Sequence, residues 1–345
     1  MNYNDIHNDF RLNGDYLDKK KLIELASKLV KSEEIYEQDF GSLILQWFDE
    51  KDFILLTTSG TTGTPKQIKL QKQAVINSAK ATGIHFDLQP KDAALLCLPT
   101  KYIAGKLMFV RALVLGLHLD VVNPSSNPLE NISKTYDFVA MVPLQVLNSI
   151  EKLHLIKKLI VGGAKLDRKI KEQILSLNSH CQVYETYGMT ETITHIAAKK
   201  ISEVFFTALP HAKISVDNRG CLVIDAQSVN PEKLITNDLV ELKESNQFKW
   251  LGRVDNVINS GGIKLFPEQI EEKLTPFINN RFFVIGKEDD ILGNKLVLII
   301  ESEPYVIEPE IFDVLSTFEK PKEIQFVTKF KETATGKILR KDNLR

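Results

Sequence analysis

The sequence predicts an α/β fold: a large N-terminal domain with a mainly parallel sheet and helices, then a small mobile α+β C-terminal domain. Its 345 residues suit about two domains at roughly 150 residues each. Short apolar runs alternate with helix-periodic stretches from Phe53 to about Tyr187, as in strand–helix units around a parallel sheet. Turn-separated strands after Ile201 add a small strand-rich subdomain. The predicted domains are residues 1–253 and 254–345.

Apolar runs bounded by Pro, Gly or Asn place the strands of the first domain. They are residues 53–57, which start the strand–helix units, and 93–98, 119–122, 138–142 and 159–161. Apolar residues at three- and four-residue spacing place the helices. These are residues 18–30, 71–84, 104–115 and 167–177. Asp167 is expected to cap the last of these helices, because its carboxylate can accept from free backbone N–H groups.

The strand-rich part and the C-terminal domain follow the same logic. Strands are predicted at residues 212–216, 221–225 and 248–251. From Asp255 onward the pattern is strand, helix, strand, strand, helix, strand. Its helices are expected at residues 267–274 and 309–318, each opened by a proline that suits the first helical turn.

Charge and composition exclude several classes of function. Lys plus Arg total 44 and Asp plus Glu total 45, a net charge of -1, which gives no electrostatic case for nucleic acid or an anionic membrane. No apolar run reaches the roughly 20 residues of a membrane span, and the three cysteines form no C-x-x-C motif. We expect a cytoplasmic protein without membrane insertion or a nucleic-acid partner. A homodimer is compatible with the sequence, which does not decide the oligomeric state.

The most informative segment is Thr57-Thr58-Ser59-Gly60-Thr61-Thr62-Gly63-Thr64-Pro65-Lys66, which follows a buried-strand pattern. Its glycines allow close approach to an anion, its hydroxyl and N–H groups can donate to phosphate oxygens, and its lysine adds a positive charge. We interpret it as a phosphate-binding loop; the alternative is a Ser/Thr/Gly surface turn. A Walker A loop does not fit, because it needs Gly at Pro65 and Ser or Thr at Gln67.

The loop resembles the signature of the adenylate-forming superfamily of acyl- and aryl-CoA ligases, luciferases and adenylation domains. Three further blocks follow in that family's order: Tyr184-Glu185-Thr186-Tyr187-Gly188-Met189-Thr190-Glu191, Leu251-Gly252-Arg253-Val254-Asp255 and Thr335-Gly336-Lys337-Ile338-Leu339-Arg340. The resemblance covers residues 53–345. It implies two half-reactions: a carboxylate attacks the α-phosphate of ATP to give an acyl-adenylate and pyrophosphate, and a thiol then displaces AMP.

The resemblance also implies roles for individual nucleotide-site residues. Thr190 would contact the α-phosphate, Glu191 would ligate Mg²⁺, and Tyr187 would stack on the adenine; an ordinary strand-end turn is the alternative. Asp238 and Arg253 would bind the ribose, unless Asp238 is only a solvated turn residue. The residues expected around the phosphates are Thr58, Ser59, Gly60, Thr61, Thr62, Gly63, Thr64 and Lys66.

Residues of the second domain would complete the chemistry. By resemblance, Lys337 would bridge the substrate carboxylate and the α-phosphate, although a solvated basic tail is the alternative. Asp255 would be the hinge about which the small domain rotates between half-reactions. Gly261 and Gly262 would let the pantetheine arm of coenzyme A pass, with Lys264 beside it, unless Lys264 is a structural surface lysine.

The acyl substrate is indicated by a weaker resemblance. Only 56 residues precede Thr57, so we expect a short form of the family, and the chain most resembles the o-succinylbenzoate-CoA ligases of menaquinone biosynthesis. The substrate pocket would contain Tyr102, Gly105, Arg111, Gly162 and Gly188, and Gly163 would share a wall with the adenine; a plain strand-to-helix turn is the alternative for the glycine pair.

Arg111 is the residue expected to distinguish the substrate. Its forked cation suits the second carboxylate of a dicarboxylic aryl acid, but it could equally be a surface helix residue. The scattered histidines His85, His118, His195 and His211 lack metal-ligand spacing, so we expect structural roles for them.

We therefore predict an ATP-, Mg²⁺- and coenzyme-A-dependent acid–thiol ligase acting on a small aryl carboxylate. One alternative loads another carboxylic acid onto CoA or a carrier protein. Another is a non-catalytic module that binds a nucleotide or acyl-adenylate.

Overall fold

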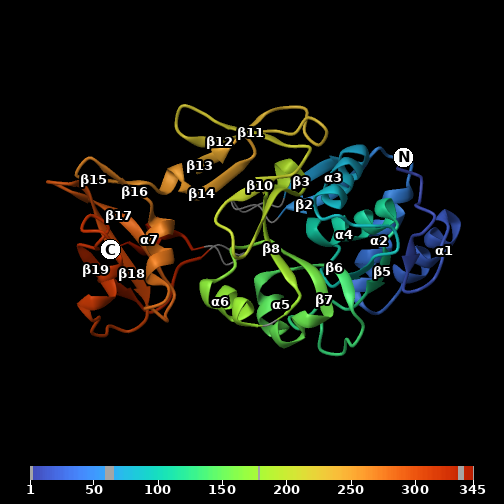
Figure 1. The fold of residues 1–345 in the computed structure, drawn as a ribbon, viewed down its shortest axis with the longest axis horizontal. Coiled ribbons are helices and arrows are strands. Elements are labelled where there is room, and N and C mark those ends of the chain that lie inside the picture. Colours follow the sequence, from blue (N-terminus) through green and yellow to red (C-terminus); the bar gives the residue numbers. More distant parts are fainter. Residues whose placement is uncertain (1–2, 59–65, 178, 333–337, 345) are drawn as a thin grey trace.

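The computed structural model describes residues 3–58, 66–177, 179–332 and 338–344. Within these ranges the strands form a twelve-stranded sheet, a five-stranded sheet and a two-stranded hairpin. The long sheet runs through the larger part of the molecule, and the C-terminal residues form a smaller body at one end (Figure 1). The predicted order of an α/β part and then an α+β part is thus observed.

A parallel half of the long sheet forms the base of the larger part. Its strands lie in the order β1, β5, β4, β6, β7 and β8, with every neighbouring pair parallel. Because parallel neighbours need crossover connections, helices separate most of these strands. The strands are β1 Arg11–Leu12, β4 Ala93–Leu96, β5 His118–Val121, β6 Tyr136–Met141, β7 Ile156–Val161 and β8 Gln182–Gly188.

The helices of the larger part lie close to their predicted positions, with two additions, at Ile35–Phe48 and Pro143–Asn148. They are α1 Lys19–Leu29, α2 Ile35–Phe48, α3 Lys72–His85, α4 Ile103–Leu115, α5 Pro143–Asn148 and α6 Arg168–Ser176, and a 3₁₀ turn, η1, spans Ile150–Leu155. The Asp167 side chain accepts from the N–H of Lys169 and caps α6 as predicted. Helix α2 was not predicted; it buries Phe40 and Trp47 in the main core.

The prediction that residues 53–57 open the parallel sheet is wrong. Strand β2 Phe53–Thr58 pairs antiparallel with β3 Lys66–Gln71 in a separate two-stranded sheet. An apolar run signals burial, and here Ile54 and Leu56 are buried in the core without a parallel neighbour. The run therefore identified a strand correctly but not the strand with which it pairs.

The predicted strand-rich subdomain does not form a sheet of its own. Its strands extend the long sheet beyond β8 in the order β9, β10, β14, β13, β12, β11, and all these neighbours are antiparallel. Short turns join successive antiparallel strands, so no helix is required between them. The strands are β9 His195–Lys200, β10 Phe206–Ala208, β11 Lys213–Val216, β12 Cys221–Asp225, β13 Leu234–Glu244 and β14 Gln247–Arg253.

The C-terminal body packs one helix and 3₁₀ turns on the five-stranded sheet. Its elements are η3 Val254–Asn256, β15 Ile258–Ser260, β16 Ile263–Leu265, α7 Pro267–Leu274, β17 Phe282–Asp289, β18 Gly293–Glu301, η4 Pro309–Val314, β19 Glu323–Val327 and η5 Arg340–Asn343. The predicted second helix, residues 309–318, is only the 3₁₀ turn η4. It ends early because Leu315 is extended, with ψ 145°, while its side chain is buried in the local core.

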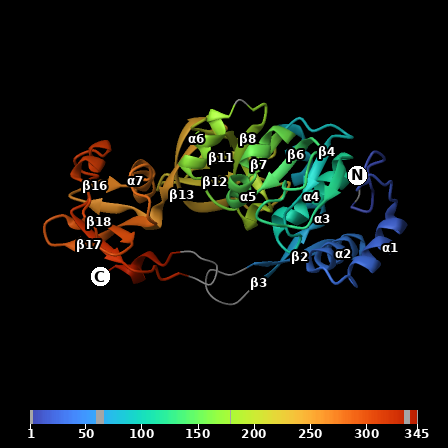
Figure 2. The ribbon, with the colours of Figure 1, turned by 90° about the horizontal axis from the view of Figure 1, so that it is seen from below.

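The hydrophobic clusters divide between the two bodies. Two clusters lie within residues 10–248 and two within residues 258–344. The bodies lie side by side in both views (Figures 1 and 2). Polar contacts join α6 and its preceding turn to the segment around α7: Lys165 Nζ lies 2.9 Å from Glu272 Oε2, and Lys169 Nζ donates to Asn279 Oδ1 at 2.7 Å.

A glycine allows the two bodies to approach closely where β14 meets α7. Gly252 has φ +146°, and a Cβ there would lie 2.5 Å from the Glu268 carboxylate. Gln269 also donates to the carbonyl of Leu251 at 3.3 Å. A larger residue at Gly252 would therefore be strained at this φ and would force the Glu268 side chain to move.

None of the helices within the described ranges has both the length and the apolar character to cross a bilayer.

Candidate active site

The carboxyl ends of β7 and β8 carry several of the predicted site residues. Gly162 and Gly163 follow β7 directly, and Tyr187 and Gly188 end β8, which pairs with β7 in parallel. Ligands of open α/β sheets gather at this edge. Gly163 has φ +83°, which favours glycine, and a Cβ at Gly188 would lie 2.4 Å from the Thr194 carbonyl oxygen. Local backbone conformation and packing therefore also favour glycine at positions 163 and 188.

Thr190 and Glu191 lie in the 3₁₀ turn η2 Thr190–Thr192, immediately beyond that edge. Glu191 is exposed, and its backbone carbonyl accepts from Asn230. Within the described residues its carboxylate has no ion-pair partner, so its oxygens are accessible to a cation. An exposed carboxylate of this kind can ligate Mg²⁺, which usually takes one or two carboxylates plus substrate phosphates.

A strained turn follows η2 and redirects the chain into β9. Ile193 has φ +64° and ψ −47°, and the Thr194 N–H donates to the Thr192 carbonyl at 2.6 Å, which closes a γ-turn. A positive φ is unfavourable for a β-branched residue. The Thr192 hydroxyl stabilises the turn, because it accepts from the Met189 N–H and lies within hydrogen-bond distance of the Thr194 carbonyl.

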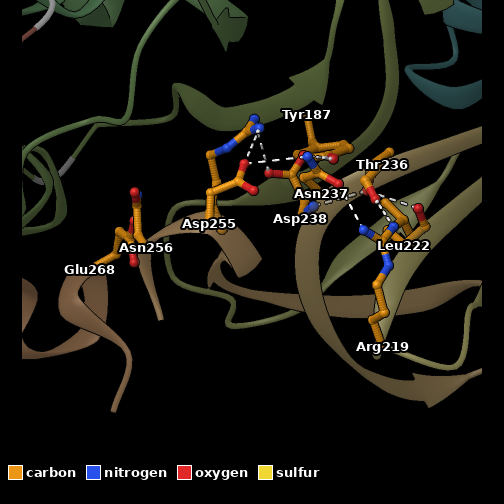
Figure 3. A network of polar contacts seen from close by, with 10 residues as sticks. Tyr187, Arg219, Leu222, Thr236, Asn237, Asp238, Asp255, Asn256 and Glu268 are labelled. Carbon is orange, nitrogen blue, oxygen red and sulfur yellow. Dashed lines mark hydrogen bonds and ion pairs between the residues drawn. The ribbon is translucent and has the colours of Figure 1, made fainter. Parts of the chain in front are cut away.

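The three residues expected around adenine and ribose lie together. Tyr187 Oη donates to Asp238 Oδ2 at 2.5 Å, and Arg253 Nη1 lies 3.9 Å from Asp238 Oδ1. Asp238 and Arg253 are opposite one another in the register of β13 and β14, and Figure 3 shows Asp238 beside Tyr187. The network continues to Asp255, whose carboxylate accepts from Arg253 at 3.1 Å and from Asn237 at 3.3 Å.

Burial controls the chemistry of this cluster. The Asp238 residue is only 8% exposed, and its backbone N–H is bonded to the Thr236 hydroxyl at 3.1 Å. Burial, and then the hydrogen bond to Asp238, raise the pKa of the Tyr187 phenol. Tyr187 therefore keeps its proton and acts as a donor, which leaves Asp238 Oδ1 as an acceptor for another hydroxyl.

Arg111 is buried on α4, so the alternative of a surface helix residue is wrong. It is 3% exposed, and Nη2 donates to Thr194 Oγ1 at 2.9 Å. Among the described residues its Nε has no hydrogen-bond partner, and none of their carboxylates forms an ion pair with it. Desolvation lowers the pKa of the guanidinium to about 10, which still leaves it charged at neutral pH.

Tyr102 and Gly105 lie at the start of the same helix. Tyr102 is the N-cap residue of α4 and is 54% exposed. A Cβ at Gly105 would lie 2.4 Å from the Pro99 carbonyl oxygen, so glycine is required there for packing. Only Arg111, of the three α4 candidates, has a buried polar group directed at other site elements.

The residues expected to act in the second half-reaction lie in the C-terminal body. Gly261 and Gly262 form the two-residue hairpin between β15 and β16, with φ +56° and +82°. Positive φ at both central positions is what such a turn needs. Lys264 on β16 is exposed, and Asp255 lies in η3, directly after the last strand of the long sheet.

Some predicted site residues cannot be placed. Ser59, Gly60, Thr61, Thr62, Gly63, Thr64 and Lys337 lie outside the described residues. For Thr58 and Lys66 the structure gives only their pairing at the open end of the β2–β3 hairpin. In the sequence, residues 59–65 thus lie between β2 and β3.

Two polar residues of the site escaped the sequence prediction. The sequence predicts no role for Thr194 and a structural role for His195, yet both lie on the segment that contacts Arg111. Their position three and four residues after Glu191 was the available signal. Among the described residues no group of three or more His, Cys, Asp or Glu side chains forms a metal cluster.

Comparison with known proteins decides the family. A model of the AMP-binding enzyme family matches residues 15–232, more than half of the chain. The chain belongs to the AMP-binding enzyme family. A solved structure from Dyadobacter fermentans, an AMP-forming acyl-CoA synthetase/AMP-acid ligase II-like protein, is 36% identical, with 93% of this chain and 97% of that one covered at a TM-score of 0.63.

Two more distant family members have named activities. The 2-succinylbenzoate–CoA ligase of Listeria monocytogenes is 24% identical, over 92% of this chain and 76% of the relative. The o-succinylbenzoate CoA synthetase of Bacillus subtilis, solved with its acyl-adenylate intermediate, is 20% identical, covers 83% and 68% of the two chains and has a TM-score of 0.70. The same enzyme has been solved with ATP and magnesium ion. The predicted family, fold class and enzyme class, an AMP-forming acid–thiol ligase, are confirmed.

Proposed function

We propose that the protein activates an aryl dicarboxylic acid with Mg-ATP and transfers the acyl group to coenzyme A, with o-succinylbenzoate as the first substrate to test. The Listeria and Bacillus relatives carry that activity in their names. The observation that carries the substrate class is Arg111, a buried guanidinium without a carboxylate partner among the described residues.

Arg111 favours an anionic substrate group for an electrostatic reason. An unpaired charge inside a protein is costly, because desolvation is not repaid by a partner. A substrate carboxylate would repay it, and the planar fork of arginine matches carboxylate geometry. The acid would therefore carry two carboxylates: one that reacts with ATP, and a distal one that Arg111 holds.

The nucleotide would lie over the ends of β7 and β8. Asp238 would accept from a ribose hydroxyl through Oδ1, since Oδ2 is engaged by Tyr187, and Arg253 would be the second ribose contact. Gly162 and Gly163 would allow the adenine and acyl groups to approach the backbone. Residues 58–66 would surround the phosphates, as their composition indicates.

Charge control would drive the first half-reaction, because a carboxylate and a triphosphate repel one another. Mg²⁺, when bound, would neutralise part of the phosphate charge, and Glu191 is the carboxylate that would hold it. Thr190 would donate to the α-phosphate, and Lys337 would bridge that phosphate and the attacking carboxylate. These residues would act mainly by positioning and electrostatic stabilisation.

The second half-reaction would need the small body to turn. We place the two bodies at residues 1–253 and 254–345, with Asp255 as the hinge; the division of the hydrophobic clusters supports this boundary. The open Gly261–Gly262 turn would then face the larger body and admit the thiol-bearing arm of coenzyme A.

The test is pyrophosphate release by the purified protein with Mg-ATP. o-Succinylbenzoate is compared with benzoate, a fatty acid and an amino acid, each with and without CoA. Release that depends on o-succinylbenzoate, with a CoA thioester formed, supports the proposal. Release with another acid, or transfer only to a carrier protein, keeps the ligase class and rejects the substrate or the acceptor. ATP binding without any release would favour a non-catalytic nucleotide-binding module.

A further inference from the structure

A chain of four side chains connects Arg111 to the interior of the larger body. Arg111 Nη2 donates to Thr194 Oγ1 at 2.9 Å, and Thr194 Oγ1 lies 3.2 Å from His195 Nδ1. On the far side of the ring, His195 Nε2 lies 3.3 Å from Thr82 Oγ1, whose hydroxyl donates to the Ser78 carbonyl at 3.0 Å. The chain thus spans α4, β9 with its preceding turn, and α3.

The hydrogen-bond chemistry permits one direction that satisfies every group. Arginine can only donate, so Thr194 Oγ1 accepts from it and has its own proton free for His195 Nδ1. At the other end, Thr82 uses its proton on the Ser78 carbonyl and can accept from His195 Nε2–H. The arrangement therefore requires a neutral His195 with its proton on Nε2.

The surroundings of His195 keep it neutral. It is buried, and the titratable or charged groups that act on it are Arg111 from α4, His85 from α3 and His211 from the segment before β11; none is a carboxylate. Desolvation first, and then the positive charge of Arg111, lower its pKa well below the usual value. A protonated ring could not accept from Thr194.

The γ-turn at Ile193 fixes the middle of the chain. Ile193 is β-branched and adopts a positive φ only when the surrounding structure constrains it. This conformation fixes the position of Thr194, the next residue. Gly188 lies against the same turn, since a Cβ there would be 2.5 Å from His195 Cα. The position of Thr194 is therefore fixed by the backbone, and its hydroxyl determines where the Arg111 guanidinium lies when it donates to it.

We infer that Thr194 and His195 are positioning residues that hold the Arg111 guanidinium in one orientation and thereby select acids with a distal carboxylate. The inference rests on the proposed function and deepens it. Two nitrogens of the guanidinium lack a strong partner in the part of the chain that the structure describes: Nε has none there, and Nη1 has the Met108 sulfur at 3.9 Å. This chain of hydrogen bonds, here called the relay, holds one N–H of Nη2, so the guanidinium plane is fixed and the N–H groups of Nε and Nη1 keep set directions in which they can donate to a substrate carboxylate.

The kinetic test compares a dicarboxylic with a monocarboxylic aryl acid, o-succinylbenzoate and benzoate. Thr194→Val keeps the shape and removes the hydroxyl, so we expect KM for o-succinylbenzoate to rise about 10- to 100-fold. KM for benzoate and for ATP should change by less than about 2-fold, and kcat should fall less than KM rises. Thr194→Ser should restore the wild-type values, and Thr275→Val, the same change at a hydroxyl of the C-terminal body, serves as the control.

The second link is tested at the imidazole. His195→Phe keeps a ring without an acceptor and should also raise KM for the dicarboxylic acid. His195→Asn, whose amide oxygen can stand in for Nδ1, should recover most of the loss. Equal effects on both acids, or no effect of Thr194→Val, would overturn the inference. Wild-type protein that releases pyrophosphate with neither acid would instead reject the proposed function.

A spectroscopic test is independent of turnover. Protein with ¹⁵N-labelled histidine should show one ring, absent from His195→Asn, with a bare Nδ1 and a protonated Nε2. That ring should stay neutral through the pH range in which free imidazole titrates. The opposite tautomer, or an ordinary titration, would refute the relay whatever the substrate is.

Discussion

Tyr187 Oη and Asp238 Oδ2 lie 2.5 Å apart and join the end of β8 to β13. The two residues are 51 positions apart in the chain, and the contact exists because the antiparallel strands continue the sheet beyond β8. It fixes one carboxylate oxygen and leaves the other as an acceptor beside Arg253. This contact therefore gives a direct test of the proposed nucleotide-binding role of Asp238.

Asp238→Asn should weaken nucleotide binding without unfolding the protein. An amide in place of the carboxylate presents a donor where an acceptor is needed, so KM for ATP should rise about 10- to 100-fold, measured by pyrophosphate release. Tyr187→Phe, which keeps the ring, should have a smaller effect. Asp225→Asn, on the adjoining strand β12, is the matched control; an equal response there would contradict the assignment.

Glu191→Gln should change the response to magnesium rather than to the acid. The neutral amide is a weaker ligand for a hard cation, so the Mg²⁺ concentration that gives half-maximal pyrophosphate release should rise about 10-fold or more. Glu232→Gln, another exposed carboxylate of the larger body, should leave the Mg²⁺ titration unchanged. An unchanged titration for Glu191→Gln would remove it as the metal ligand.

Lys337→Ala should separate the two half-reactions. Adenylation should fall by on the order of 10²-fold or more, while thioester formation from supplied acyl-adenylate survives, because only the first step needs the bridging cation. Lys341→Ala, at another lysine of the same C-terminal segment, is the control. Equal loss in both half-reactions would contradict the rotation of the small body about Asp255.

Stability should fall below neutral pH because of buried histidines. Above about pH 6.5, His195 is neutral in both the folded and the unfolded protein. As the pH falls below that value the unfolded state gains a proton that the folded state does not, because the folded-state pKa is lowered. The free energy of unfolding should fall by up to about 1.4 kcal/mol per pH unit for this residue.

Urea denaturation at several pH values measures this slope. His85 and His211, whose pKa values burial also lowers, should contribute in the same direction. His195→Asn should reduce the slope, and an undiminished slope in that variant would assign the effect to the other histidines.

A buried lysine provides a separate stability prediction. Lys72 is 0% exposed, and its Nζ donates to Asp49 Oδ1 at 2.8 Å and to the Asp49 carbonyl at 3.1 Å. Asp49→Ala leaves the cation without its carboxylate, so the free energy of unfolding should fall by about 2–4 kcal/mol, less than for a fully buried pair because Asp49 is partly exposed. Asp52→Ala in the same turn region is the control for denaturant titration.

Local signals in the sequence predicted much of the larger body. Asp167 marked the start of α6, and the glycine pair at 162 and 163 marked the end of β7, because capping and turn chemistry depend on neighbouring residues. Helix α2 carried a readable signal too: Phe40, Leu43, Ile44 and Trp47 have helical spacing and are buried. The sequence therefore contains the information needed to predict this helix.

Long-range contacts explain the rest. Nothing near residues 53–57 tells whether a strand pairs with β3 or joins the parallel sheet, since that choice depends on the whole fold. Likewise, Arg111 could be a surface or a buried residue on local evidence alone. Thr194 contacts Arg111 because of the turn after η2. That turn depends on the positive φ of Ile193, which an isoleucine in the sequence does not indicate.

The contacts of Lys165 with Glu272 and of Lys169 with Asn279 have a consequence for solution conditions. They join side chains of the two bodies near the surface. The first is an ion pair, whose attraction dissolved ions screen with a screening length of about 10 Å at 0.1 M ionic strength. Added salt should therefore weaken the hold of α6 on the segment around α7 while leaving both hydrophobic cores intact. Ionic strength would then act as an external control over how readily the bodies part, and with it over the proposed rotation of the small body.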